Sequence, residues 1–193
     1  MNKLEEKLWS MKTANRKGVE EIQSLFTPVN LRKGLIIGSP DYSSPILHFI
    51  EEGLVMGYSI IDGVDHPSWL AEQGFIPPIG GFFSKQPLEE FVQVLENTKV
   101  WYLNLTKTES QAQKNNDLYR MLLEIFEENL QLTRQREMFL RIPSAKNRFS
   151  KLIHCHKPYI YKVNNEILAA LLNVSKNHLI KIKSLHAKSH LDY

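Results

Sequence analysis

The sequence predicts an α+β protein in three parts: a strand-rich N-terminal body, one long helix and a C-terminal helix-turn-helix. Three observations lead to this order. Short apolar runs punctuated by glycine and proline fill the first half, a long run without either residue follows, and two short helical patterns lie in a basic region at the end. At 193 residues the chain is long enough to bury a substantial core.

The N-terminal body begins with helical patterns up to about residue 26, where "GVEEIQSLF" is amphipathic. Runs such as "GLIIGSPDYSSP" and "FIPPIGGFFSKQP" follow, and "VWYLNLT" (residues 100–106) is predicted to be the last strand. Turn residues recur about every eight to twelve positions, which is typical of an antiparallel sandwich or barrel.

A long helix is predicted from Glu109 to Leu140, because neither glycine nor proline occurs there. It carries two apolar rows, one packing on the strands and one left for a partner helix. The first row holds Leu118, Leu122, Ile125, Asn129 and Leu132; the second holds Tyr119, Leu123, Phe126 and Leu130. We assign the dimer contact to the first row, because a polar Asn129 would fix the register there. The alternative is one wide core-facing stripe in a monomer.

After "RIPSAKNRF" the sequence predicts a helix from about Lys146 to His154, a short strand "YIYKV", and two helices separated at "LLNVS". Ser175 stands at the N-cap position of the last helix. The small residues Ala169 and Ala170 allow two helices to cross closely. Helix, tight turn and helix together predict a helix-turn-helix.

Charge is distributed unevenly along the chain. From Arg141 onward there are ten Lys and Arg against two Asp and Glu, a net charge of +8. The first 140 residues carry 14 against 19, a net charge of −5. A basic region joined to an acidic body is typical of nucleic-acid binding, although solubility alone can also produce it.

Several classes of protein are disfavoured. The sequence contains no P-loop, dinucleotide fingerprint, nucleophile elbow or HExxH pattern, so nothing indicates an enzyme. The lone Cys155 excludes an intrachain disulfide, and its neighbours His154 and His156 are poorly placed to share one metal ion. No apolar stretch reaches the length of a membrane span, and the charged start is unlike a signal peptide, so we expect a cytoplasmic protein.

The order of parts resembles the Crp/Fnr superfamily of transcription regulators, and more closely its divergent cyclic-nucleotide-binding-like members common in Bacteroidetes. The resemblance runs from about Val19 to Ser184 and rests on "LFTPVNLRKG", "ILHFIEEGLV", "FFSKQPLEEFVQVLENTKVWYL", "AKNRFSKLI" and "ILAALLNVSKNHLIKIK". It implies a β-roll sensor domain of the jelly-roll type (1–108), a connecting dimerisation helix (109–140) and a winged helix-turn-helix (141–193). It also implies a homodimer on palindromic double-stranded DNA, with RNA polymerase as a further partner and no membrane.

By this resemblance the recognition helix begins at Ser175. Its base-contacting residues fall on Lys176, Asn177 and Lys181, with His178 and Lys183 near phosphates. The family usually has arginine at the position of Lys181 and glutamate at that of Asn177. Asn173 replaces the glycine usual in the turn, and asparagine tolerates the left-handed geometry.

A rival interpretation is a small-ligand-binding or protein-interaction module whose DNA-binding domain has degenerated. Lysines replace the arginines of the recognition helix, and the apolar Ile180 stands where the family usually has a small polar residue. An Ile180 exposed on the groove-facing side would weaken the case for DNA reading.

The expected sensor site departs from the family pattern. No arginine lies between Arg32 and Arg120 to compensate a cyclic phosphate, so we expect neither cAMP nor cGMP, and no cofactor. The candidate effector pocket comprises Gly80, Gly81, Phe82, Phe83, Ser84 and Lys85. Lys85 is either part of a small anion site or an exposed turn residue, and the two phenylalanines either line a pocket or fill it. His48 and His66 are the available haem ligands, but histidines in strands are usually structural.

Overall fold

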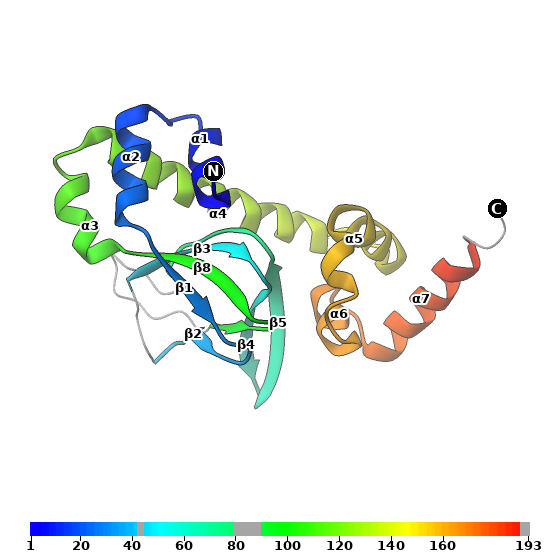
Figure 1. Ribbon diagram of the computed structural model, residues 1–193. Helices are drawn as coiled ribbons and strands as arrows, with labels where there is room; N and C mark the ends of the chain where they lie inside the picture. Colours follow the sequence, from blue (N-terminus) through cyan, green and yellow to red (C-terminus); the bar gives the residue numbers. More distant parts are fainter. Residues whose placement is uncertain (42–44, 79–89, 190–193) are drawn as a thin grey trace.

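The computed structural model describes residues 1–41, 45–78 and 90–189 (Figure 1). The candidate effector pocket, residues 80–85, lies outside the described residues. Helices α1 (Lys3–Ser10) and α2 (Arg16–Leu25) come first, as the helical patterns at the N-terminus predict.

Two four-stranded antiparallel sheets follow, and we call them the roll. The first has the order β1 (Thr27–Leu31), β8 (Thr98–Asn104), β3 (Ile46–Glu52), β6 (Gly74–Ile76). The second has the order β2 (Ile36–Gly38), β7 (Phe91–Val94), β4 (Val55–Ile61), β5 (Val64–Ala71). The β4–β5 hairpin turns at Asp62 and Gly63, whose φ angles of 52° and 75° fit the two-residue turn that matches strand twist. The antiparallel body predicted from the turn spacing is confirmed.

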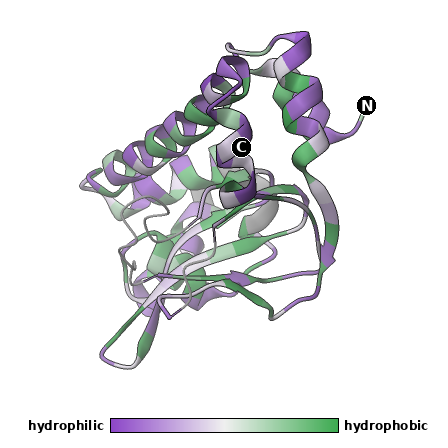
Figure 2. Cartoon of the chain, turned by 90° about the vertical axis from the view of Figure 1, so that its left-hand side faces the viewer, coloured by the Kyte–Doolittle hydropathy of each residue, from purple (hydrophilic) through white to green (hydrophobic). Residues whose placement is uncertain are grey.

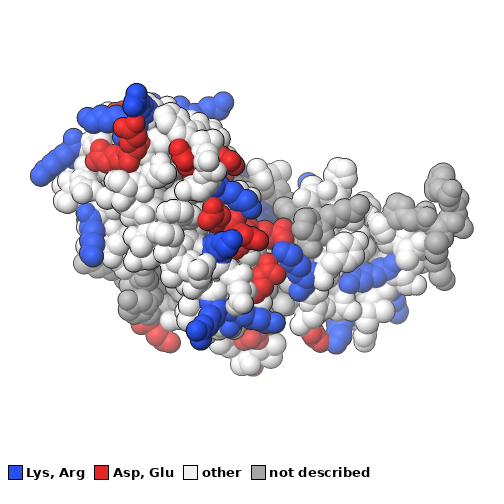
Figure 3. Space-filling view, in the orientation of Figure 1, with Lys and Arg blue, Asp and Glu red and all other residues white. Residues whose placement is uncertain are grey.

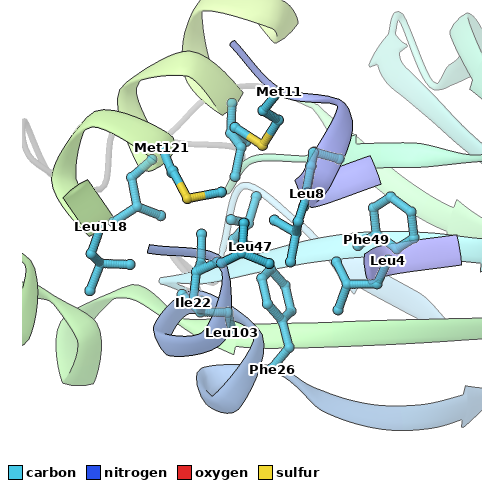
Figure 4. Close-up of a cluster of buried hydrophobic side chains, with 14 of the residues drawn as sticks. Leu4, Leu8, Met11, Ile22, Phe26, Leu47, Phe49, Leu103, Leu118 and Met121 are labelled. Atoms are coloured by element: carbon cyan, nitrogen blue, oxygen red, sulfur yellow. The ribbon is translucent and has the colours of Figure 1, made fainter. Parts of the chain in front are cut away.

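The main core lies between the first sheet and four helices, because Leu105 and Ala112 of α3 (Leu105–Ala112) also belong to it. Leucines of α1, Ile22 of α2 and residues of α4 (Asn116–Leu140) meet Leu47, Phe49 and Leu103 of the sheet (Figure 4). A second cluster fills the space between the sheets and consists of Ile50, Val55, Ile76, Val92 and Val94. Strands and helices both carry hydrophobic and hydrophilic residues, as expected for elements with one buried face (Figure 2).

The predicted long helix is confirmed over Asn116–Leu140, but its uninterrupted start at Glu109 is wrong. Helix α3 (Leu105–Ala112) ends before α4 begins, and residues 113–115 separate them. The Asn115 side chain accepts the backbone N–H groups of Asp117 (3.0 Å) and Leu118 (3.4 Å), so it caps the new helix. Asparagine is one of the preferred N-cap residues, and this local bond ends the continuous helix.

The assignment of the dimer row on α4 is also wrong. Leu118, Leu122 and Ile125 are only 0%, 9% and 0% exposed, because they pack on α1, α2 and the roll of the same chain. Of the same row, Asn129 is half-buried and Leu132 is 52% exposed. The second row contains the exposed residues Tyr119, Leu123 and Leu130, with Phe126 partly buried.

Helices α5 (Ala145–Ile160), α6 (Asn165–Leu171) and α7 (Lys176–Ser189) form a separate group, which we call the head. The predicted strand at residues 159–163 is wrong, because α5 continues to Ile160 and that side chain is buried in the head. Within the described residues no strand follows Asn104, so the wing strands implied by the resemblance are not seen there. No helix in the described part of the chain is long and apolar enough to cross a membrane.

Candidate nucleic-acid interface

The turn between α6 and α7 is only four residues long (172–175) and is held by local hydrogen bonds. Asn173 has a φ of 51°, the left-handed geometry expected for it. Its N–H donates to Ala170 O (2.9 Å), and Val174 N–H donates to Ala169 O (3.0 Å), which satisfies the last carbonyls of α6. Ser175 then caps α7, because its Oγ accepts the His178 N–H at 3.2 Å. The predicted tight turn and N-cap are confirmed.

Arg148, on α5, holds this turn through side-chain hydrogen bonds. Its side chain is buried, and its Nε donates to the carbonyl of Leu172 at 2.9 Å, next to Asn173. Its Nη1 donates to the carbonyls of Ile142 (2.5 Å) and Pro143 (3.4 Å), in the link between α4 and α5. A buried guanidinium needs such acceptors, and here it ties the helix link to the turn that orients α7.

Helix α7 has one buried face and one outward face. Leu179 and Ile182 are 0% and 3% exposed and belong to the core of the head. The residues opposite them follow the spacing of one helical face and are all exposed: Asn177, Ile180, Lys181 and Ser184. The prediction contained Asn177 and Lys181 but missed Ser184, which the period set by Leu179 and Ile182 could have found.

The lysines of α7 differ in their partners. Lys176 Nζ lies 2.5 Å from Glu166 Oε1, and Lys183 Nζ donates to Asn165 Oδ1 at 2.6 Å. Both partners are in the first turn of α6, so these two lysines bridge the helices at the edge of the outward face. Lys176 in turn lowers the pKa of the Glu166 carboxyl through its hydrogen bond and charge. Among the described side chains, Lys181 has no ion-pair partner and is free to meet a ligand.

The head is seated on the roll. Leu54 is buried in the head core, and Leu70 and Leu95 pack against it, so apolar side chains of the roll complete that core. Helix α6 packs against β5, and α7 extends away from the roll (Figure 1). Acidic and basic side chains lie next to one another where the roll meets the head (Figure 3). The contact between the head and the roll therefore leaves the outward face of α7 uncovered by the roll.

No protein-family model and no curated protein matches the sequence. Solved structures do match. A CooA mutant from Carboxydothermus hydrogenoformans aligns over 98% of this chain and 85% of its own, with a TM-score of 0.65 and 14% identity. The c-di-GMP-responsive global regulator CLP from Xanthomonas campestris aligns over 91% and 93%, with a TM-score of 0.68 and 15% identity. A protein assigned to the Crp/Fnr family from Eubacterium rectale aligns over 91% and 85%, with a TM-score of 0.66 and 13% identity.

Each of these alignments takes in the roll, α4 and the head together, because it covers at least 91% of the chain. The chain has the Crp/Fnr fold. The resemblance seen in the sequence is thereby confirmed at the level of the fold, in spite of the low identity.

The roll contains one half-buried histidine, His48. Burial lowers the pKa of His48, on β3, from 6.5 to about 4, so its imidazole is neutral at pH 7. His66 is exposed on β5, in the other sheet. The two histidines considered as haem ligands therefore lie in different sheets and in different surroundings. In the described part of the chain no three His, Cys, Asp or Glu side chains gather in a group that could hold a metal ion.

Proposed function

We propose that this protein is a sequence-specific DNA-binding transcription regulator whose α7 lies in the major groove. The observation that carries the proposal is the outward face of α7. It projects from a fixed two-helix unit, its described residues are exposed, and among them Lys181 has no ion-pair partner. A helix of this kind fits the major groove, and its first turns face the base edges.

The side chains of this face suggest how bases are read. Asn177 can pair with the N6 and N7 atoms of adenine, and Lys181 can donate to the O6 and N7 atoms of guanine. Lysine presents a point charge rather than the planar fork of arginine, so guanine is read with less geometric selectivity. Lys176 and Lys183 extend from the edge of the face, where they suit phosphate contacts once DNA competes with Glu166 and Asn165. His178 is exposed at the opposite edge of the face.

A homodimer is the second part of the proposal. The exposed second row of α4 is Tyr119 (50%), Leu123 (51%) and Leu130 (68%), with the partly buried Phe126 between them. Their spacing of four, three and four residues is the heptad pattern of helices that pack side by side. Two copies joined along this row would present two α7 helices to the two halves of a palindromic site.

The proposal includes no cyclic nucleotide and no cofactor. The support is chemical: residues 33–119 contain no arginine to hold a buried phosphate, and Lys85 is the only lysine between Lys33 and Lys99. The regulator CLP responds to c-di-GMP, and this response is not carried over to the present protein. RNA polymerase remains a proposed partner of the DNA-bound form.

The test is selection from a randomised duplex pool with the purified full chain, followed by sequencing and by fluorescence-anisotropy titrations at several salt concentrations. The proposal predicts a palindromic consensus and an affinity that falls steeply with salt, because each phosphate contact releases counterions. Weak binding with a shallow salt dependence and no enriched sequence would contradict it and favour a module without DNA-reading output.

A further inference from the structure

Ile180 stands out on the outward face of α7. It is 47% exposed, whereas Leu179 and Ile182 on either side of it in sequence are almost fully buried. Around the helix, at about 100° per residue, Asn177 and Lys181 lie about 60° and 100° to one side of Ile180. Lys176 and Lys183 lie about 40° and 60° to its other side, so polar groups border it on both sides. Ile180 does not belong to any of the hydrophobic clusters formed by the described residues.

The fold itself does not account for isoleucine at this position. A side chain that is half exposed gains little from burial, and a β-branched residue is a weaker helix former than alanine or leucine. A single apolar side chain among polar ones is also too small a patch to dock a protein. What suits it is a small apolar group presented among hydrogen-bonding groups.

The major groove presents one such group, the C5-methyl of thymine, beside the acceptors and donors of the neighbouring bases. We propose that Ile180 packs against the methyl group of a thymine in each half-site and is a specificity-determining residue of α7. This inference rests on the proposed DNA binding and deepens it. The sequence alone counted an exposed Ile180 against DNA reading, and the structure does leave it exposed; on this inference the same exposure serves base contact. The half-site should contain a thymine next to the bases read by Asn177 and Lys181.

The experiment uses the duplex selected by the full-length protein. Each thymine of the half-sites is replaced, one symmetric pair at a time, by deoxyuridine, which removes the methyl group and leaves the hydrogen-bonding edge unchanged. Removing one methyl contact is expected to weaken binding about fourfold, and about fifteenfold when both half-sites are changed. One thymine pair should show this loss with the wild-type protein.

Two protein variants test whether Ile180 is the residue that senses the methyl group. Ile180→Ala should bind the thymine duplex more weakly and should no longer distinguish it from the deoxyuridine duplex. Leu185→Ala is the matched control, because Leu185 is 58% exposed on the same helix but points about 140° away from Ile180. It should keep the full sensitivity to deoxyuridine. Neither side chain is buried, so both variants should fold, as circular dichroism can check.

Three outcomes overturn the inference. The first is selective binding with no thymine pair sensitive to deoxyuridine, and the second is a sensitivity that Ile180→Ala retains; in both, the proposed regulator stands and only the role of Ile180 fails. The third is an absence of selective DNA binding, which removes the proposed function as well.

Discussion

Lys162, in the turn between α5 and α6, donates a hydrogen bond to Glu96 Oε1 at 3.0 Å and lies 3.2 Å from Glu72 Oε1. Both glutamates belong to the roll, so one lysine of the head bridges two carboxylates of the other part. The hydrogen bond to Glu96 and the nearby carboxylates raise the pKa of Lys162. Together with the apolar contacts of Leu54, Leu70 and Leu95, this bridge seats the head on the roll.

Reversing the charge of Lys162 should weaken the contact between the head and the roll. Lys162→Glu places three carboxylates together and is expected to lower the free energy of unfolding by about 1 kcal/mol, the upper range for partly exposed ion pairs. Denaturant unfolding measures this. Adding Glu72→Lys and Glu96→Lys restores opposite charges and should recover most of the loss. A triple variant no more stable than Lys162→Glu would show that the bridge contributes nothing.

The two rows of α4 should respond differently to substitution. Leu123→Asp or Leu130→Asp puts charge on the exposed row and is expected to give a folded monomer, seen by sedimentation, because a buried carboxylate opposes helix pairing. Leu122→Ala instead leaves a cavity in the core of the protomer and should lower the free energy of unfolding by about 2–5 kcal/mol while the folded protein stays dimeric. The reverse pattern would return the dimer contact to the first row.

The two rows of α4 also show which features of the fold can be predicted from the sequence and which cannot. Periodicity identified both stripes, but which one faces the core depends on α1 and α2, which pack on α4 from far away in sequence. Local chemistry predicted the Ser175 cap and the left-handed Asn173 correctly, because each acts within a few residues. The aromatic and β-branched run at residues 159–163 favoured a strand, yet burial of Ile160 in the head core extended α5 instead. The Asn115 cap was missed for lack of a glycine or proline signal.

Glu166 should restrain non-specific DNA binding. Glu166→Gln removes a negative charge from the edge of the reading face and frees Lys176. Affinity for random duplex is expected to rise, and the slope of log affinity against log salt should steepen by about one unit, corresponding to one more phosphate contact. Anisotropy titrations measure both. Glu20→Gln, which breaks the exposed pair with Arg16 on α2, is the charge-matched control and should change neither. An effect of equal size in the control would indicate a response to net charge only.

His48 should make the protein sensitive to mild acid. Its pKa is about 4 in the folded chain against 6.5 when unfolded, because burial disfavours the charged imidazole. The unfolded state binds the proton first as pH falls, so stability is full above pH 6.5 and is lost towards pH 4, at about 1.4 kcal/mol per pH unit. Unfolding measured from pH 7.5 to 5 should show this slope, and His48→Gln should lack it. His66→Gln, at the exposed position, should retain it. An unchanged slope in His48→Gln would assign the effect elsewhere.

The most direct test of the central claim, that the outward face of α7 reads DNA, compares Lys181→Ala with the wild-type protein on the selected duplex and on a shuffled duplex. Lys181 is exposed and has no ion-pair partner among the described residues, so its loss should leave the fold intact. The account predicts a loss of about 1–3 kcal/mol on the selected site and a clearly smaller loss on the shuffled one. Equal losses would make Lys181 a phosphate contact only. Unchanged affinity for both duplexes would contradict the claim that this face meets DNA.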